Sequence, residues 1–94
     1  MSESAYRVQI EDKAERELKS FEKKICERIA RRIDQLILDP RGSNCKPLKD
    51  LSGIWRLRVG NYPVICEIKD TQLIVFVIRI AHRREAHRDL WPSK

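Results

Sequence analysis

Residues 54–62, Ile54-Trp55-Arg56-Leu57-Arg58-Val59-Gly60-Asn61-Tyr62, contain a strand pattern followed by a turn signal. The apolar residues Trp55, Leu57 and Val59 alternate with Ile54 and two arginines. A period of two residues is typical of a β-strand whose two faces meet different surroundings. Gly60-Asn61 is a pair that tight β-hairpin turns favour, so residues 62–68 should return as an antiparallel strand.

Two more strands are predicted outside this hairpin. Residues 73–80 contain the longest apolar run, from Leu73 to Ile78, and they follow a polar turn at residues 69–72. We expect this strand near the centre of the sheet, where both faces are covered. Near the start of the chain, Tyr6, Val8 and Ile10 alternate with other residues and predict a short, half-buried strand.

Two helices are predicted between the first strand and the hairpin. Apolar residues at helical spacing indicate a first helix over about residues 13–22, with Asp12 as its N-cap. A second apolar series, from Ile25 to Ile37, indicates an amphipathic helix of about four turns that ends at Asp39-Pro40. Its other face is charged and carries Lys24, Glu27, Arg28, Arg31, Arg32 and Asp34. The two helices should pack as an antiparallel hairpin, and residues 41–53 should form an irregular connection in which Leu48 and Leu51 can cover the edge of the core.

The predicted order is β-α-α-β-β-β, an α+β fold of two layers. A helical hairpin on one face of a mainly antiparallel four-stranded sheet buries the apolar sides of both layers. The opposite face stays partly open and carries Arg56 and Arg58, about 7 Å apart along their strand, a spacing that matches adjacent phosphates of a nucleic acid. A length of 94 residues indicates a single domain over residues 1–94.

Charge narrows the class of partner. The chain has 20 Lys and Arg against 14 Asp and Glu, and the excess is larger in residues 51–94 than in residues 1–50. Most basic residues of that second half are arginines, whose planar guanidinium groups suit phosphate. This pattern favours a polyanion such as a nucleic acid or an acidic protein segment, although a solvated surface is the alternative.

The cysteines do not predict a metal site. Cys26, Cys45 and Cys66 are widely spaced, form no Cys-x-x-Cys pair and lie far from either histidine in the sequence. We expect reduced thiols and neither a metal nor a cofactor. The chain starts with no secretory signal pattern, and its longest apolar run is much shorter than the roughly 20 residues that cross a membrane as a helix. The cytoplasm is therefore the expected compartment.

The ordered set of these segments resembles the RelE/ParE superfamily of toxins, the toxin halves of bacterial and archaeal type II toxin–antitoxin pairs. The resemblance rests on the order of the elements, on residues 54–62, on His82-Arg83-Arg84-Glu85 after an apolar strand, and on Lys46-Pro47-Leu48-Lys49 before the hairpin. It covers about residues 6–89.

The resemblance implies an activity for the RelE-like members. Such toxins cleave messenger RNA in the ribosomal A site without a metal and leave a 2′,3′-cyclic phosphate. That reaction needs a base for the 2′-hydroxyl proton, cations for the charge that grows on the phosphorus, and an acid for the departing 5′-oxygen.

Carried over to this sequence, the family's site residues match in part. Arg56 and Arg58 fall at the basic pair of the hairpin strand, and Arg83 falls at the arginine after the last strand. Pro63 stands where active ribonucleases usually have arginine, and His87 stands where they usually have tyrosine. An imidazole is a competent proton donor at neutral pH, so the proton transfers should fall to His87 or His82. The expected catalytic set is Arg56, Arg58, Arg83 and His87; the expected RNA-binding set is Arg56, Arg58, Arg79, His82, Arg83 and Arg84.

Three functions stay open at this point. The first is a ribosome-dependent messenger RNA endoribonuclease that inhibits translation. The second is a ParE-like inhibitor of DNA gyrase, which the loss of the arginine at Pro63 fits. The third is a weakly active relative that mainly binds its antitoxin. The expected partners are a cognate antitoxin, the ribosome and messenger RNA, and a toxin–antitoxin hetero-oligomer that contacts operator DNA through the antitoxin. No membrane partner is expected.

Overall fold

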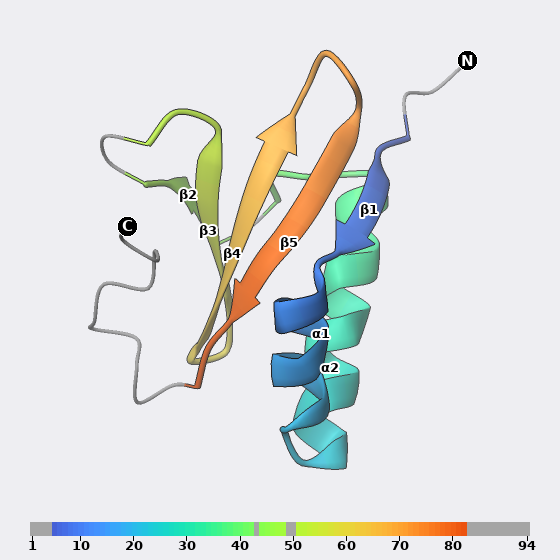
Figure 1. Cartoon of the computed structure of the whole chain (residues 1–94), viewed down its shortest axis with the longest axis vertical. Helices are drawn as coiled ribbons and strands as arrows, with labels where there is room; N and C mark the ends of the chain where they lie inside the picture. The colour runs from blue at the N-terminus through green and yellow to red at the C-terminus, as the bar shows by residue number, and fades with distance from the viewer. Residues whose placement is uncertain (1–4, 43, 49–50, 83–94) are drawn as a thin grey trace.

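Five strands form one mixed sheet in the order β1-β5-β4-β3-β2 (Figure 1). The structure is a computed structural model that describes residues 5–42, 44–48 and 51–82. The strands are β1 (Arg7–Ile10), β2 (Cys45–Pro47), β3 (Ile54–Val59), β4 (Tyr62–Lys69) and β5 (Ile74–Ile80). β1 runs parallel to β5, and the other neighbours are antiparallel. The prediction of an α+β fold with a mainly antiparallel sheet is confirmed.

Two details of the predicted sheet were wrong. The sheet has a fifth strand, because β2 lies in the predicted irregular connection and pairs with β3. Pro47 can end this strand because β2 is at the edge of the sheet. On the outer side of an edge strand no neighbouring strand needs a backbone N–H donor. The middle strand is β4, whereas β5 lies between β4 and β1. The apolar run of β5 is therefore interior but not central.

The hairpin of β3 and β4 has the predicted register. Val59 pairs with Tyr62 across a turn formed by Gly60 and Asn61. Gly60 has φ +61°, while Asn61 is not among the residues with positive φ. A positive φ at the first central residue alone is the pattern of a type II′ turn, which glycine accommodates without strain.

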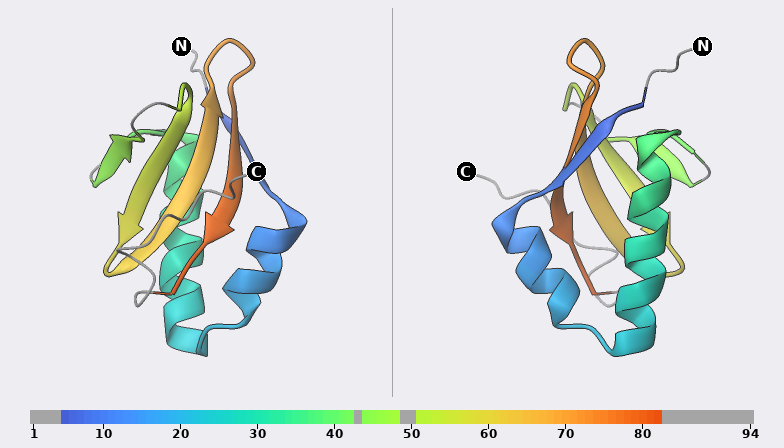
Figure 2. Two further views of the ribbon diagram at one scale, coloured as in Figure 1. Left: turned by 60° about the vertical axis from the view of Figure 1, so that its left-hand side comes forward. Right: turned by 90° about the vertical axis from the view of Figure 1, so that its right-hand side faces the viewer.

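Two helices cover one face of the sheet (Figure 2). α1 (Asp12–Lys19) packs mainly on β5, and α2 (Lys23–Asp34) lies against β3 and continues into the 3₁₀ turn η1 (Gln35–Ile37). The first helix is shorter than predicted, because the Ser20 hydroxyl donates to the Glu17 carbonyl oxygen at 2.6 Å and the chain turns there. Asp12 is also not the cap: it begins the first helical turn, and Glu11 precedes it without a side-chain capping bond.

The main core lies between the helices and the sheet. Ala14, Leu18, Ile29 and Ile33 from the helices meet buried residues of β3, β4 and β5, the latter being Leu57, Val59, Val64, Cys66, Ile68, Val75, Val77 and Ile80. Complete burial of one such aliphatic side chain contributes about 1.5–3 kcal/mol. These contacts fix which residues of each strand face the helices.

A second, smaller cluster covers part of the opposite face. Ile54, Ile65 and Ala81 are buried there, and Leu48, Leu51 and Ile78 pack on them. Leu48 and Leu51 thus cover buried residues on this face, and not the edge of the main core as predicted. Outside this cluster, the same face carries the remaining side chains of β3. No helix in the described part of the chain is long and apolar enough to span a membrane.

Candidate functional site

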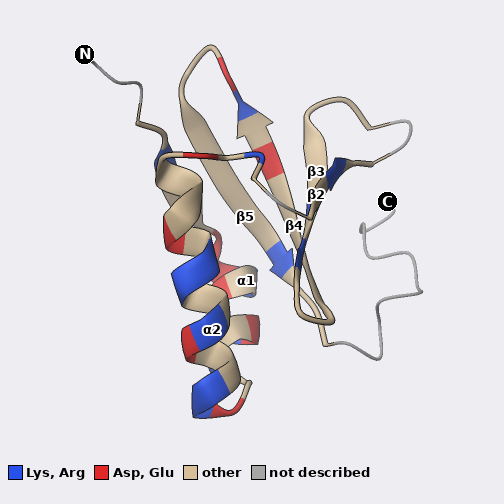
Figure 3. Cartoon of the chain, turned by 180° about the vertical axis from the view of Figure 1, so that it is seen from behind, with Lys and Arg blue, Asp and Glu red and all other residues tan. Residues whose placement is uncertain are grey.

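Cationic side chains of β2 and β3 share the sheet face opposite the helices. Leu57 and Val59 are buried in the core under the helices, so the alternation of β3 places Arg56 and Arg58 on the other face. Lys46 is the direct cross-strand partner of Arg56, and such partners lie on the same face. Figure 3 shows basic positions on both strands. We call Lys46, Arg56 and Arg58 the cationic face; the sequence predicted its two arginines and not the lysine.

Pro63 lies beside this face and is apolar. It pairs with Arg58, and its ring is fully buried. The Arg58 N–H donates to the Asn44 carbonyl at 3.0 Å and so points away from β4. Arg58 and Pro63 are therefore a non-hydrogen-bonded pair of the antiparallel ladder. Proline has no N–H group, but at this position none is needed for a bond to β3. The strand tolerates proline here, and the position beside Arg58 is apolar.

Arg79 is held at the edge of the sheet by α1. β1 reaches only as far as Val77 along β5, so the edge of β5 beyond it has no strand neighbour on that side. Glu17 takes this place: Oε2 accepts from Arg79 Nε at 3.0 Å and Nη2 at 2.8 Å, and Oε1 accepts from the Ile80 N–H at 2.7 Å. Arg79 therefore has a structural partner, and its predicted contact with RNA stays a prediction.

The irregular pairing of β5 helps to bring Arg79 to this edge. Ile65 pairs with Arg79 and Cys66 with Val77, so Ile78 is an extra residue in β5. An extra residue of this kind bends the strand and re-aims the side chains around it. Arg56, Ile65 and Arg79 are in register across three strands, but the side chain of Arg79 engages the helix layer.

His82 lies against the ring of Phe21, a residue that packs on the main core under the helices. Its ring centroid is 4.4 Å from that of Phe21, which in turn meets Tyr62 edge-on at 5.3 Å. The preceding residue, Ala81, donates its N–H to the Pro63 carbonyl at 2.9 Å. The end of β5 is thereby fastened beside the start of β4, next to the cationic face. Arg83, Arg84 and His87 lie outside the described residues.

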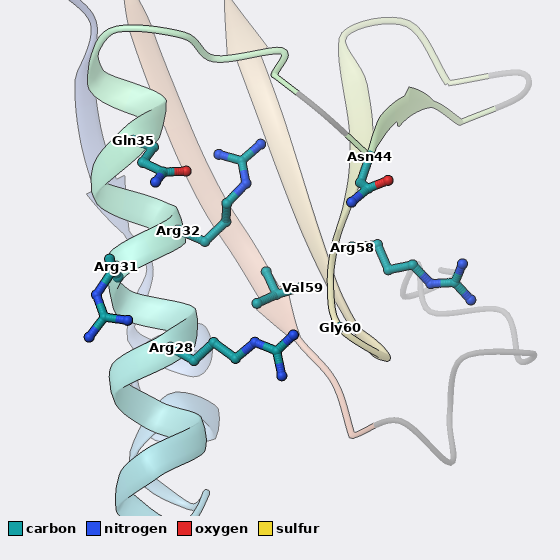
Figure 4. Close-up of a pocket in the computed structure, with 8 residues that line it drawn as sticks. All are labelled: Arg28, Arg31, Arg32, Gln35, Asn44, Arg58, Val59 and Gly60. Atoms are coloured by element: carbon teal, nitrogen blue, oxygen red, sulfur yellow. The ribbon is translucent and has the colours of Figure 1, made fainter.

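A second group of arginines lies on the helix side and was not predicted as a site. Arg28, Arg31 and Arg32 of α2 line a concavity of about 260 Å³ together with Gln35, Asn44, Arg58, Val59 and Gly60 (Figure 4). From the sequence, these helical arginines were predicted only to lie on the charged face of the second helix. Their spacing, with Gln35 one turn further along, was the signal for a polar stripe on one side of the helix.

Two of the three thiols, those of Cys45 and Cys66, are poorly suited to nucleophilic chemistry. Burial raises the pKa of Cys66 to about 12, and burial also raises the pKa of Cys45. All three cysteines are free thiols. Within residues 5–42, 44–48 and 51–82, no group of His, Cys, Asp and Glu side chains is arranged to hold a metal ion.

A network of hydrogen bonds and an ion pair joins Tyr6, Arg41 and Asp70 at the end of the sheet that contains the β4–β5 turn. The Asp70 carboxylate accepts from the Tyr6 hydroxyl and from Arg41 Nη2, each at 2.6 Å. The bond from Arg41, followed by that from Tyr6, lowers the pKa of Asp70. The Arg41 guanidinium carbon also lies 4.8 Å from the centroid of the Trp55 ring. This network holds β1, the β4–β5 turn and the segment before β2 in place.

Comparison with known proteins agrees with this architecture. The model of a family described as the ParE toxin of type II toxin–antitoxin systems, parDE, matches residues 8–87. No curated protein sequence matches the chain significantly.

Solved structures share the fold at low sequence identity. The RelE–RelB complex from Pyrococcus horikoshii OT3 contains a chain that is 22% identical, with a TM-score of 0.77 over 90% of this chain and 99% of that one. A chain of the RelBE2 toxin–antitoxin complex from Mycobacterium tuberculosis is 26% identical, with a TM-score of 0.73 over 83% and 98% of the two chains. A chain of the intact Escherichia coli RelBE complex is 21% identical, with a TM-score of 0.68 over 82% and 95%.

These matches confirm the resemblance that the sequence indicated. The family model spans most of the chain, from β1 to beyond β5. The solved structures share the helix pair on a mixed sheet. The chain therefore belongs to the ParE toxin family, within the RelE/ParE superfamily of type II toxin–antitoxin toxins.

Proposed function

We propose that this toxin is a ribosome-dependent, metal-independent endoribonuclease that cuts messenger RNA and so inhibits translation. The observation that carries the proposal is the cationic face, where Lys46, Arg56 and Arg58 lie on one side of two paired strands. The end of β5, from which the chain continues to Arg83, is fastened beside this face through Ala81 and Pro63.

The cationic face suits an RNA backbone. Side chains two residues apart on a strand are separated by about 7 Å, so Arg56 and Arg58 can each contact a different phosphate. Lys46 adds a third positive charge across the strand pair, within about 5.5 Å of Arg56 at the Cβ atoms. Guanidinium groups can each donate two parallel hydrogen bonds to a phosphate, which orients it as well as attracts it.

Each step of the proposed cleavage has a candidate group. The 2′-hydroxyl loses its proton to a base, and the 2′-oxygen forms a bond to the adjacent phosphorus. The bond from phosphorus to the 5′-oxygen breaks, an acid protonates that oxygen, and a 2′,3′-cyclic phosphate is left. Arg56, Arg58 and Arg83 would stabilise the charge on the phosphate oxygens. Arginine stays protonated, so His87 or His82 would have to carry the proton.

A specific observation favours a second candidate, inhibition of DNA gyrase. The matching family model is that of the ParE toxin, and the buried ring of Pro63 leaves the position beside Arg58 without a cation. A toxin that lacks one transition-state cation would be a weaker ribonuclease. Gyrase inhibition needs none of the proposed proton transfers.

An antitoxin partner accompanies either activity, because an unrestrained toxin would harm the cell that makes it. The similar chains from Pyrococcus horikoshii and Escherichia coli were solved with their RelB antitoxins. For this chain we propose a cognate antitoxin with an acidic, amphipathic segment that folds on the toxin. The hetero-oligomer would bind operator DNA through the antitoxin, and the toxin would act in the cytoplasm. A protein that binds only its antitoxin is the remaining alternative.

Primer extension on a messenger RNA translated in vitro tests the proposal. Cuts within A-site codons are expected with the wild type, and they should be lost with Arg56→Ala/Arg58→Ala, with Arg83→Ala and with His87→Ala. Arg7→Ala is the matched control, because Arg7 is an exposed arginine of β1 at the other edge of the sheet. Normal translation without cuts, together with inhibited supercoiling by gyrase, would replace the ribonuclease by the second candidate. If neither reaction responds and free protein leaves growth unchanged, the antitoxin-binding role is left.

A further inference from the structure

A concave group of arginines lies between α2 and the β3–β4 hairpin, apart from the cationic face. Arg28 extends from α2 toward the hairpin, whereas Arg32 extends toward Gly42, in the segment between η1 and β2 (Figure 4). The guanidinium of Arg58 points away from the concavity. The guanidinium of Arg28 lies 3.1–3.2 Å from the place that a Cβ atom at Gly60 would occupy. We call Arg28, Arg31 and Arg32, with Gln35 and Asn44, the α2 cleft.

The charges of the α2 cleft are only partly neutralised within the chain. Among the described residues, Arg28 and Arg31 have no carboxylate within ion-pair distance. Arg32 has Asp39 nearby, since the Arg32 Nη2 atom and the Asp39 Oδ2 atom lie 3.0 and 3.2 Å from the Cβ position of Gly42. Like charges held together repel one another, and a bound anion relieves that repulsion.

The lining indicates the chemistry of that anion. Guanidinium groups suit phosphate, and the amides of Gln35 and Asn44 offer both donors and acceptors of hydrogen bonds. Among the lining residues that the structure describes, Val59 is the only one with an aliphatic side chain. An acidic peptide that orders on binding needs apolar anchors to offset its loss of conformational entropy, and this cleft offers almost none. A nucleic-acid backbone supplies repeated charge without such anchors.

We propose that the α2 cleft binds the phosphodiester backbone of a nucleic acid. This second binding surface is separate from the cationic face, which is proposed above to bind messenger RNA. Arg28 contacts phosphate oxygens beside the hairpin and Arg32 contacts them nearer Gly42. Gln35 and Asn44 hydrogen-bond to the sugar-phosphate edge. The cleft lies on the helix side of β3, whereas Arg56 lies on the other side of the same strand. One nucleic acid that wraps the β3–β4 hairpin, or two separate segments, can occupy both surfaces. This inference holds whether or not the cationic face cuts RNA.

Binding of a fluorescent 2′-O-methyl oligoribonucleotide tests the cleft without any cleavage, because the probe has no free 2′-hydroxyl. Each lost contact with a single-stranded phosphate lowers the slope of log K against log salt by about 0.7, which is about a fivefold loss of affinity at about 0.1 M salt. Arg28→Gln should therefore weaken binding about fivefold, and Arg28→Gln/Arg32→Gln about 25-fold with a slope change of about 1.4. Arg28 is exposed, so its single variant should fold even if the double variant does not.

Arg7→Gln/Arg16→Gln is the matched control, because it removes the same charge from exposed positions on β1 and α1. Little change in this control, with loss in the cleft variants, supports the proposal. An equal loss of affinity in the control and in the double cleft variant would overturn the proposal, because net charge alone would then explain the binding. Competitors distinguish the anion: duplex DNA or unlabelled RNA should displace the probe. Displacement by polyglutamate at the same charge concentration would indicate an acidic protein instead, and displacement by inorganic phosphate at the same charge concentration would indicate a site for a single free phosphate.

Discussion

Glu17→Ala is expected to destabilise the fold far more than a neighbouring glutamate substitution on the same helix. The Glu17 carboxylate accepts two hydrogen bonds from Arg79 and one from the Ile80 N–H, at 2.7–3.0 Å. The side chains of Arg79 and Glu17 are only 17% and 20% exposed. Removal of the carboxylate leaves a mostly enclosed guanidinium and an edge amide without these partners.

The size of the effect follows from this partial burial. Breaking a buried ion pair costs about 3–5 kcal/mol, and an exposed pair is worth about 0–1 kcal/mol. The Glu17–Arg79 pair lies between these limits, and water can replace part of what is lost, so we expect about 2–3 kcal/mol. A domain of this size loses about 4–8 °C in Tm per kcal/mol, which gives a decrease of about 10–20 °C.

Glu15→Ala is the matched control. Glu15 pairs with Lys19 at 3.5 Å, and both side chains are well exposed. Such a pair on a helix surface contributes about 0.3–0.5 kcal/mol. Both substitutions replace glutamate by alanine in α1, so the change in helix propensity is the same. Glu17→Gln should fall between them, because its amide oxygen can still accept from the Ile80 N–H.

Thermal and urea unfolding, followed by circular dichroism, measure these differences. In an Arg79→Ala background, Glu17→Ala should cost only the bond to Ile80, so the two effects should not add. If Glu17→Ala is no more destabilising than Glu15→Ala, the carboxylate does not fasten the edge of β5. The structural role that we assign to Arg79 would then be wrong.

Three further predictions concern other parts of the molecule. The hydrogen bond from Arg41, and then that from Tyr6, lowers the pKa of Asp70, so this carboxylate contributes stability above its ordinary pKa of about 4 and loses it as the pH falls further. The difference in unfolding free energy between the wild type and Asp70→Asn should thus be constant above about pH 5 and shrink in acid, as urea titrations at a series of pH values can measure. Cys66, with a pKa of about 12, should resist alkylation at about pH 8 until the protein unfolds, because only about one thiol in 10⁴ is ionised at that pH. Mass spectrometry of labelled peptides measures this. Labelling of Cys66 as fast as of Cys26 in the folded protein would contradict the prediction. Gly60→Ala should cost about 1 kcal/mol or more in urea unfolding, since φ is +61° and the new methyl would press on the Arg28 guanidinium, and an unchanged midpoint would refute the turn geometry.

The strands and helices were largely predictable because their signals are local. Alternation in residues 54–59 and the Gly60-Asn61 turn fix a hairpin whichever elements surround it. Helical spacing of apolar residues located α1 and α2, although not their ends. The end of α1 depends on the Ser20 hydroxyl, which competes for a backbone carbonyl of the last turn. β2 was missed because three residues with a terminal proline carry no strand pattern of their own, and only the edge of β3 makes them a strand.

Some residues of the candidate sites were likewise predictable from local sequence patterns, and others were not. The sequence alone placed Arg56 and Arg58 on one face, because the period of a strand is fixed at two residues. It also carried the family resemblance, which the match over residues 8–87 confirms. Two other features depend on how distant segments pack. Arg79 pairs with Glu17, 62 residues away. The arginines of α2 line a concavity with Asn44 and Gly60. Side chains so distant in sequence meet only when the helix layer packs on the sheet, and no local pattern encodes the register of that packing.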